Sequence, residues 1–561
     1  MLIYKGNRFN TALIMINTKL LSEANLLVKK RDFDSAEKIY LDLLRDNPNN
    51  DIVQSFLGRL YIMKKKYKAA ERILETAYNQ HKTAPTIASL AFCKYRMKKF
   101  DDAIILYEEL FKYDPDNTKI YDRIIQAFRE LEMYNFSHAY ALKFYNKHPD
   151  KEAANVRLTQ SYMDLGDIKQ AEISCAKTIQ SFPKSGAAWI MAGNLQEFMY
   201  CNEELAQDCY QTAIDYNAPS AYYHLAVSCQ KVGNFKEAED NYKKMIELMP
   251  NEDYVYASLG TLYLTQKNMT KGYQYFIKRE KAPEAKTLKN MWNGDVLKEE
   301  TLLLYCDQGY GDHIQFIRYL PFLTDKFKII KVLTRENCIQ LFERSYSKKD
   351  YPNVEFYDDL NNINNYDKYV MASDLPYFLN IDFDNIPTPN GYLKFDEQKK
   401  EYFKNKYFNT DKLKVGLCWK AGGIGMRAAI NRTINIDYFK KVLGLEKVQF
   451  YSFQLEDIFD AVEKYPQMID LKKELKTFDD TASAMANLDL FISADTSCAH
   501  LAGALGIKSF LLIPYCSDWR WFENTEKTEW YTSVELFKQE DRQDWFIEAD
   551  KIYEKLKEIT E

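Results

Sequence analysis

The sequence predicts a helical solenoid followed by two α/β segments, each built on a parallel sheet. Small residues recur every 32 to 36 positions through the first half of the chain, and this pattern stops near residue 290. After that point, strand-like apolar runs alternate with helical segments in two successive cycles. At 561 residues the chain is long for one domain, but a solenoid stacks its units without a single shared core.

The first half of the chain is an internal repeat. One small residue marks each unit, at Ala36, Ala70, Ala103, Ala139, Ala171, Ala206, Ala238 and Gly272. Small residues let two helices pack closely, and the prolines that follow four of these anchors by twelve positions end the second helix of a pair. The pattern resembles the tetratricopeptide repeat, with about eight units over residues 17–285 after an N-terminal segment, 1–16. Such arrays usually bind a peptide or protein on their concave face, and a spacer or dimerisation arm is the alternative.

The second half is expected to form two α/β halves, residues 286–395 and 396–561. Within residues 286–395, the apolar run Leu302–Cys306 is typical of a buried strand, and the further expected strands are KIIKVLT, NVEFYDD and KYVMAS. In the second half the expected strands are KVGLCWK, VQFYSFQ, LDLFISAD and SFLLIPY. Strands that alternate with helices form parallel sheets, and ligands bind at the carboxyl ends of such strands. We therefore expect a binding site in the cleft between the two sheets.

The stretch ADTSCAHLAGALG places a helix start directly after a strand. Asp495 ends the strand, and Thr496 and Ser497 begin a helix that also contains His500. The free N–H groups of a helix's first turn favour an anion, here a phosphate or diphosphate. A capped helix without a ligand is the alternative.

A glycine turn follows the first strand of the first sheet. Gly309 and Gly311 allow the backbone to approach a ligand closely, and Asp312 stands at the helix start, facing the cleft. The alternative for Asp312 is a helix cap, and the alternative for His313, like that for His500, is a hydrogen-bonded strut. In the second sheet, cationic groups at Lys420 and Arg432 are candidates to meet a diphosphate.

Five segments together carry a family resemblance. DQGYGDHIQFIRYLP, GLCWKAGG with NRTI, FYSFQ, ADTSCAHLAGALG and DWRWF resemble the heptosyltransferase-like glycosyltransferases of the GT-B class. The resemblance is closest to the bacterial branch in which tetratricopeptide repeats precede the catalytic part. It implies two Rossmann-like domains in a GT-B arrangement, with residues 286–395 on the acceptor side and residues 396–561 on the nucleotide-sugar side.

The resemblance also implies an activity. A sugar would pass from a nucleoside-diphosphate donor to a protein acceptor held by the repeats, by inversion, without a metal and without a cofactor. Two further possibilities are a glycan or lipid-linked saccharide acceptor, and a catalytically inactive scaffold that binds proteins through its repeats.

By motif position, the resemblance implies roles for individual residues. The implied catalytic residues are Asp312, which would be the general base, and the neighbouring His313. The donor and phosphate set comprises Gly309, Gly311, Lys420, Arg432, Gln454, Asp495, Thr496, Ser497 and His500. Within that set Asp495 is expected near the donor sugar and Gln454 near the nucleoside. Arg427 and Lys420 rival Arg432 for the leaving diphosphate.

One feature of a related enzyme is missing. The O-linked N-acetylglucosamine transferase also joins such repeats to a GT-B part, and it lines its superhelix with asparagines at one helix position. The corresponding positions here carry no such ladder: Ser22, Phe56, Ser89, Ile125, Arg157, His224 and Ser258. An acceptor would therefore be held by specific side-chain pockets.

Composition bears on the remaining classes of partner. A net charge of −5 means that the chain lacks the excess of positive charge typical of proteins that bind nucleic acid. Lys5, Asn7 and Arg8 interrupt the first apolar run, so we expect no membrane span. The ten cysteines include no CxxC pair, which favours reduced thiols and a cytoplasmic location. Asp382-Phe383-Asp384 mimics a metal-binding DxD motif, but it lies in a loop-like stretch, and we expect no metal there.

Overall fold

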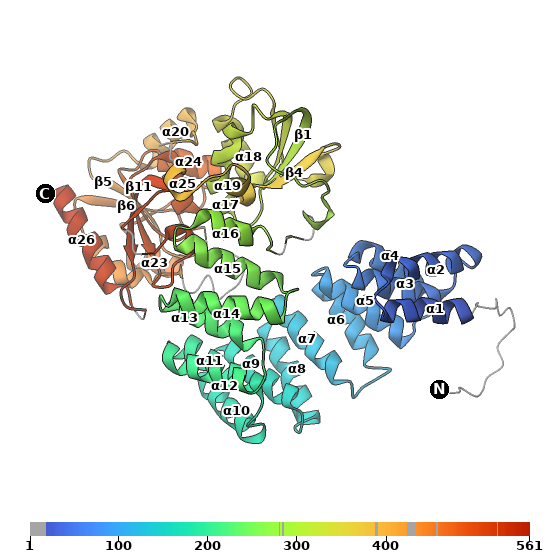
Figure 1. Ribbon diagram of the computed structural model, residues 1–561. Coiled ribbons are helices and arrows are strands. Elements are labelled where there is room, and N and C mark those ends of the chain that lie inside the picture. The colour runs from blue at the N-terminus through green and yellow to red at the C-terminus, as the bar shows by residue number, and fades with distance from the viewer. Residues whose placement is uncertain are drawn as a thin grey trace. The chain divides into compact units, whose positions relative to one another are not determined.

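The computed structural model describes residues 18–279, 281–282, 285–387, 391–422, 432–455, 458–523, 526–542 and 544–561. The chain divides into two compact units, unit 1 (Met1–Tyr200) and unit 2 (Cys201–Glu561), and each is described by itself. Figure 1 shows helices throughout unit 1, and helices followed by two sheets in unit 2.

Unit 1 is an array of paired helices. Its helices are α1 (Thr18–Lys29), α2 (Phe33–Asp46), α3 (Asp51–Met63), α4 (Tyr67–Gln80), α5 (Ala84–Arg96), α6 (Phe100–Leu110), α7 (Thr118–Glu130), α8 (Tyr134–Lys147), α9 (Glu152–Leu165), α10 (Ile168–Ser181) and α11 (Gly186–Met199). The small anchor residues lie where helices touch. Ala36, Ala70 and Ala103 are fully buried, and a Cβ on Gly58 would lie 2.4 Å from Cγ of Leu74. The predicted close packing of helix pairs is therefore present.

Each helical pair turns at a residue with left-handed backbone. These residues repeat at the spacing of the units, in both units of the chain: Arg31, Lys65, Lys98, Glu132, Gly166, Cys201, Gly233 and Lys267. Only Gly166 and Gly233 adopt this conformation without a steric cost, because the other six carry a Cβ. The turn geometry is thus imposed by the packing of the helices it joins.

Unit 2 begins with five more helices of the same kind. They are α12 (Glu203–Asp215), α13 (Ala221–Lys231), α14 (Phe235–Leu248), α15 (Asp253–Thr265) and α16 (Met269–Phe276). With α1 to α11 they make sixteen helices within the described residues, so the helical half is a tetratricopeptide-repeat solenoid.

Two sheets follow in unit 2. The first has the order β3-β2-β1-β4 and is parallel throughout, with β1 (Leu297–Tyr305), β2 (Phe327–Leu333), β3 (Val354–Tyr357) and β4 (Lys368–Met371). The second has the order β10-β11-β9-β8-β5-β6-β7, with β5 (Leu413–Cys418), β6 (Val448–Ser452), β7 (Ile469–Asp470), β8 (Leu490–Ala494), β9 (Ser509–Ile513), β10 (Lys527–Thr528) and β11 (Tyr531–Lys538). Only the β10–β11 pairing is antiparallel among these strands.

The sequence patterns predicted the central strands and missed three at the sides of the second sheet. β7 and β10 have two residues each, too few for a visible period. The helices between the strands are α17 (Tyr310–Phe316), α18 (Glu336–Ser345), α19 (Leu375–Phe378), α20 (Glu397–Tyr407), α22 (Lys440–Leu443), α23 (Phe459–Lys464), α24 (Phe478–Met485), α25 (Ser497–Leu505) and α26 (Phe546–Thr560).

The last helices of the solenoid share a hydrophobic core with both sheets. This core contains Tyr273 and Phe276 of α16, Ile314 of α17, Leu501 of α25 and Trp519. Tyr273 and Phe276 make edge and tilted contacts with the Trp519 ring, at 6.3 and 5.9 Å between ring centres. The division between compact units accordingly lies at residue 200, inside the repeat array, and the boundaries expected at residues 285 and 395 stay predictions.

Candidate functional site

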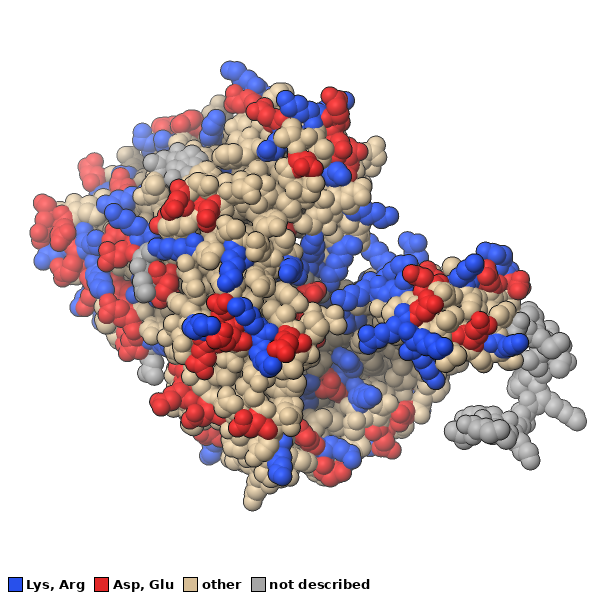
Figure 2. Space-filling view, in the orientation of Figure 1, with Lys and Arg blue, Asp and Glu red and all other residues tan. Residues whose placement is uncertain are grey.

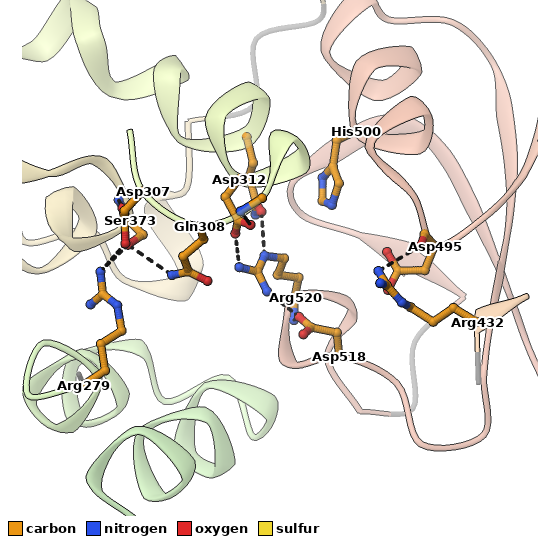
Figure 3. A network of polar contacts seen from close by, with 12 residues as sticks. Arg279, Asp307, Gln308, Asp312, Ser373, Arg432, Asp495, His500, Asp518 and Arg520 are labelled. Carbon is orange, nitrogen blue, oxygen red and sulfur yellow. Dashed lines mark hydrogen bonds and ion pairs between the residues drawn. The ribbon is translucent and has the colours of Figure 1, made fainter. Parts of the chain in front are cut away.

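The candidate site is centred on two helices that start at strand ends of different sheets. α17 follows β1 of the first sheet, α25 follows β8 of the second, and the two helices pack against each other. A Cβ on Gly311 would lie 2.7 Å from Cδ2 of His500, so only glycine allows this approach. The residues predicted from the two strand ends are therefore brought together (Figure 3).

The turn between β1 and α17 is strained and tightly held. Gln308 has a φ of +70°, which is costly for a residue with a side chain. Its carbonyl accepts a hydrogen bond from Nη2 of Arg335 at 2.8 Å, and Gly309 N–H donates to Oδ2 of Asp312 at 3.0 Å. These bonds fix the orientation of the Asp312 carboxylate.

Asp312 forms an ion pair with Arg520, a residue whose importance the sequence did not reveal. Nη2 of Arg520 donates to Oδ1 of Asp312, Nη1 donates to Asp518 at 2.7 Å, and Nε donates to Oε1 of Gln315 at 3.0 Å. The Asp312 side chain is 14% exposed, and burial raises its pKa although Arg520 opposes this shift. A carboxylate with a raised pKa is a better proton acceptor near neutral pH.

Asp495 and Arg432 lie together on the second-sheet side (Figure 3). Nη1 of Arg432 donates to the carbonyl oxygen of Asp495 at 3.1 Å and lies 3.9 Å from its Oδ2. Burial is the main cause that raises the pKa of Asp495 to about 6, and Asp518 adds to the effect. Of the rival cations, Arg427 lies outside the described residues, and Lys420 is partly buried.

The hydroxyl of Thr496 is directed toward the sheet rather than toward its own helix. It lies 3.1 Å from the Ser493 hydroxyl and makes no capping bond to α25. Ser497 is the first residue of this helix and is partly exposed. The Thr496 side chain therefore does not cap the N–H groups in the first turn of α25. An anion site at a helix start requires N–H groups that no side chain caps.

Both histidines of the predicted site are buried supports. Nδ1 of His313 lies 2.9 Å from the Thr334 hydroxyl, and burial lowers its pKa to about 4. Nδ1 of His500 lies 2.9 Å from the hydroxyl of Tyr531, its ring stacks on Trp521, and burial lowers its pKa well below the usual value. Both imidazoles are therefore neutral at physiological pH.

Gln454 holds the loop that contains Lys420. Its Oε1 accepts hydrogen bonds from the N–H groups of Trp419 (3.1 Å) and Lys420 (2.9 Å), and its Nε2 donates to the Lys420 carbonyl (2.9 Å). The amide is 2% exposed. Gln454 therefore positions the Lys420 loop, and the expected place of Gln454 near the nucleoside stays a prediction.

A second buried network connects the end of the solenoid to the same turn (Figure 3). Arg279, just after α16, pairs with Asp307 at 2.7 Å and with Asp374, and it donates to the Ser373 hydroxyl at 2.5 Å. Asp307 lies two residues after the end of β1 and directly precedes Gln308. A lone arginine after a helix carries no sequence signal of such a role, because its partners are 28 to 95 residues away.

Other motifs from the sequence have structural roles. Trp519 and Trp521 are 5% and 0% exposed, so they are part of the core. Asp382 caps a short 3₁₀ turn through the Phe383 N–H at 2.9 Å. Among the residues that the structure describes, no group of metal-ligating side chains is found, and no helix is long and apolar enough to cross a membrane. All ten cysteines are free, and seven are buried.

A groove in unit 2 does not coincide with the candidate site around Asp312 and Asp495. A groove of about 1400 Å³ lies elsewhere in unit 2, between α13 to α15 and the second sheet, and its lining residues include Lys231, Ser258, Cys516 and Glu554. Neither Asp312 nor Asp495 borders it.

Comparison with known proteins identifies the helical part. Residues 27–91 and 219–252 match the tetratricopeptide repeat. Protein FlbA of Caulobacter vibrioides (strain ATCC 19089 / CIP 103742 / CB 15) is 26% identical in an alignment of 287 residues, and the match covers 45% of this chain and 46% of that protein. The chain thus spans about half the length of the curated relative it matches.

Two solved structures show partial similarity to this chain. A tetratricopeptide repeat protein from Parabacteroides merdae ATCC 43184 is 16% identical, with a TM-score of 0.39, over 43% of this chain and 96% of that one. Yeast Tom70 is 15% identical, with a TM-score of 0.38, over 45% and 56%. The two matched segments define a protein with tetratricopeptide repeats, and such repeats commonly bind protein partners.

Proposed function

We propose that this chain is a glycosyltransferase that moves a sugar from a nucleoside-diphosphate donor to a protein acceptor held by the repeats. The observation that carries the proposal is the meeting of α17 and α25, which start at strand ends of two parallel sheets. This meeting brings a buried carboxylate, Asp312, near the second-sheet group of Asp495 and Arg432. Ligands of open parallel sheets bind at this end of the strands.

In the proposed reaction Asp312 is the general base. It takes the proton of the acceptor hydroxyl while that oxygen forms a bond to the anomeric carbon. The bond from this carbon to the diphosphate oxygen breaks, and its electron pair leaves with the diphosphate. One displacement of this kind inverts the anomeric centre. Arg520 and the Gly309 N–H hold the carboxylate in place, as a base of this kind requires.

Positive charge is supplied to the leaving diphosphate from the second sheet. Arg432 is oriented by the Asp495 carbonyl, and Lys420 lies on the loop held by Gln454. The first turn of α25 adds backbone N–H groups at Thr496 and Ser497. The proposal therefore involves neither a metal ion nor a cofactor, because protein groups neutralise the charge that develops.

A second candidate function is a scaffold that binds proteins through its repeats without catalysis. It is favoured by one observation, that both carboxylate oxygens of Asp312 are already engaged, by Arg520 and by Gly309. A transferase for a glycan or lipid-linked saccharide uses the same site chemistry and differs only in its acceptor.

Nucleotide binding separates the transferases from the scaffold. The full chain is heated with UDP, GDP, ADP, CDP or CMP, and a ligand at about 100 times its Kd stabilises the unit that binds it by about 2.7 kcal/mol. We expect one diphosphate to raise the unfolding temperature, and Arg432→Ala to abolish the shift. Asp312→Asn should keep the shift and lose sugar transfer. No shift with any nucleotide at millimolar concentration would favour the scaffold.

A further inference from the structure

Three arginines of unit 1 lie on aromatic rings in three successive repeats. The guanidinium carbon of Arg59 (α3) lies 5.6 Å from the ring centre of Phe56. That of Arg96 (α5) lies 5.5 Å from Tyr67 and 6.0 Å from Phe92. That of Arg123 (α7) lies 5.2 Å from Phe92 and 5.6 Å from Tyr95. We call Arg59, Arg96 and Arg123, with these rings, the arginine surface.

The arginine surface is continuous across the three repeats. Nε of Arg59 donates to the Ser89 hydroxyl of α5 at 3.0 Å, which joins α3 to α5. Arg96 and Arg123 share the Phe92 ring, which joins α5 to α7. Figure 2 shows Lys and Arg side chains gathered over α4 to α6 of unit 1.

These arginines differ from their neighbours in having no acidic partner. Within the described ranges, none of the three forms an ion pair, whereas Arg129 pairs with Asp164 at 2.5 Å and Arg157 with Asp122 at 2.6 Å.

Other cations near the surface are paired as well. Lys94, on the same helix as Arg96, is neutralised by Glu71, Glu75 and Asp102.

The missing carboxylate has an energetic cost at Arg59. Burial lowers the pKa of this guanidinium, and Tyr40 opposes the shift. A guanidinium that stacks on a ring keeps its N–H edge free for a carboxylate, which it binds through two parallel hydrogen bonds. What the three repeats share is an arginine that lies on aromatic rings and, within the described residues, forms no ion pair.

We propose that the arginine surface binds an acidic segment of a partner polypeptide, with carboxylates on the three guanidinium groups and apolar side chains against the rings. A polypeptide fits because the surface offers one cation per repeat within a repeat array that commonly binds proteins. That the bound polypeptide is the acceptor rests on the proposed function; that it is acidic does not.

The test measures the affinity of the full chain for a fluorescein-labelled peptide of repeating Glu-Phe-Gly units by fluorescence anisotropy. A peptide with Gln in place of Glu serves as the neutral probe. The variant Arg59→Gln/Arg96→Gln/Arg123→Gln removes three positive charges. The matched control, Lys68→Gln/Lys112→Gln/Lys169→Gln, removes three exposed charges from the same unit outside the arginine surface. Circular dichroism checks that both variants unfold at the wild-type temperature.

We expect the triple arginine variant to bind the Glu peptide at least about tenfold more weakly, since one hydrogen bond to a charged group is worth about that factor. The lysine control should change affinity less than about twofold, as exposed charges are screened by salt. Equal losses in the two variants, or equal affinity for Glu and Gln peptides, would overturn the proposal. If single-stranded RNA binds more tightly than the Glu peptide, and the arginine variant loses this binding, the surface is a nucleic-acid site and the proposal is wrong. Nucleotide stabilisation of unit 2 is measured in a separate experiment. If the arginine surface does not bind the acidic peptide, the proposed transferase activity is unaffected. If no nucleotide stabilises unit 2, the proposal for the arginine surface is unaffected.

Discussion

The repeat helices of unit 1 and those of unit 2 have the same sequence pattern but different surroundings. The anchors Ala70 in unit 1 and Ala238 in unit 2 are both fully buried between paired helices. Yet Tyr273 and Phe276 of α16 belong to a core that also contains residues of both sheets. The comparison shows that one repeat pattern can build either an independent array or part of a larger unit, and four tests probe that difference.

The largest effect is expected at Arg279. Arg279→Met leaves Asp307 and Asp374 buried without their cation, which costs about 3–5 kcal/mol in unit 2. In unit 1, Arg157→Met breaks a partly exposed pair with Asp122 and should cost less than about 1 kcal/mol. Urea unfolding followed by tryptophan fluorescence reports mainly on unit 2, because six of the seven tryptophans lie there. Similar costs for the two variants would contradict the comparison.

Gly311 should be next in size. Gly311→Ala forces a Cβ against His500, which Tyr531 and Trp521 hold in place, and such overpacking costs about 1–3 kcal/mol. Gly166→Ala in unit 1 meets no atom within 4 Å and should cost about 1 kcal/mol from its left-handed φ alone. Only Gly311→Ala should also weaken nucleotide-induced stabilisation. If Gly166→Ala weakens it equally, Gly311 has no special part in the site.

The pH dependence of stability should have opposite signs in the two units. Asp495 in unit 2 has a pKa raised to about 6 from 3.8, so the folded state binds the extra proton and stability falls as the pH rises from about 4 to 6. Asp495→Asn should remove about 1–3 kcal/mol of this change.

In unit 1, the pKa of Glu37 is lowered by Lys64 although burial works against the shift. Stability from that group is present above its unfolded pKa and is lost as the pH falls through the folded value. Calorimetry between about pH 3 and 7 measures both slopes, because the Glu37 slope lies below about pH 4.5. A wild-type unit 2 that is equally stable from about pH 4 to 6 would refute the assignment for Asp495.

The smallest effects are expected at the left-handed turns. Lys65→Gly in unit 1 relieves the steric cost at a φ of +57°, and we expect a gain of a few tenths of a kcal/mol after the extra entropy of glycine. Lys267→Gly in unit 2 relieves a similar φ but loses a contact of Lys267 with the Phe383 ring at 4.7 Å, worth about 0.5–1 kcal/mol. Thermal unfolding compares the pair. Equal gains would mean that the contact between Lys267 and Phe383 contributes nothing.

The sequence by itself determined the elements whose signal is local and periodic. Small residues at a spacing near 34 predicted the paired helices, and the apolar runs predicted the central strands of both sheets. The residues that follow these strands were predicted to line one cleft between the two sheets, because ligands bind at the carboxyl ends of parallel strands. Asp312, Asp495 and His500 do lie in one region.

Only the tertiary structure decided which of these residues form hydrogen bonds and ion pairs, and with which partners. Arg520 and Arg279 became central only through partners far away in the sequence, since an ion pair leaves no periodic trace. The hydrogen bonds between the Gln454 amide and the Lys420 loop likewise join residues more than 30 positions apart, which no local pattern records. Where the compact units divide was also decided in three dimensions, because the repeat pattern records how a helix packs on its pair and not what else covers it.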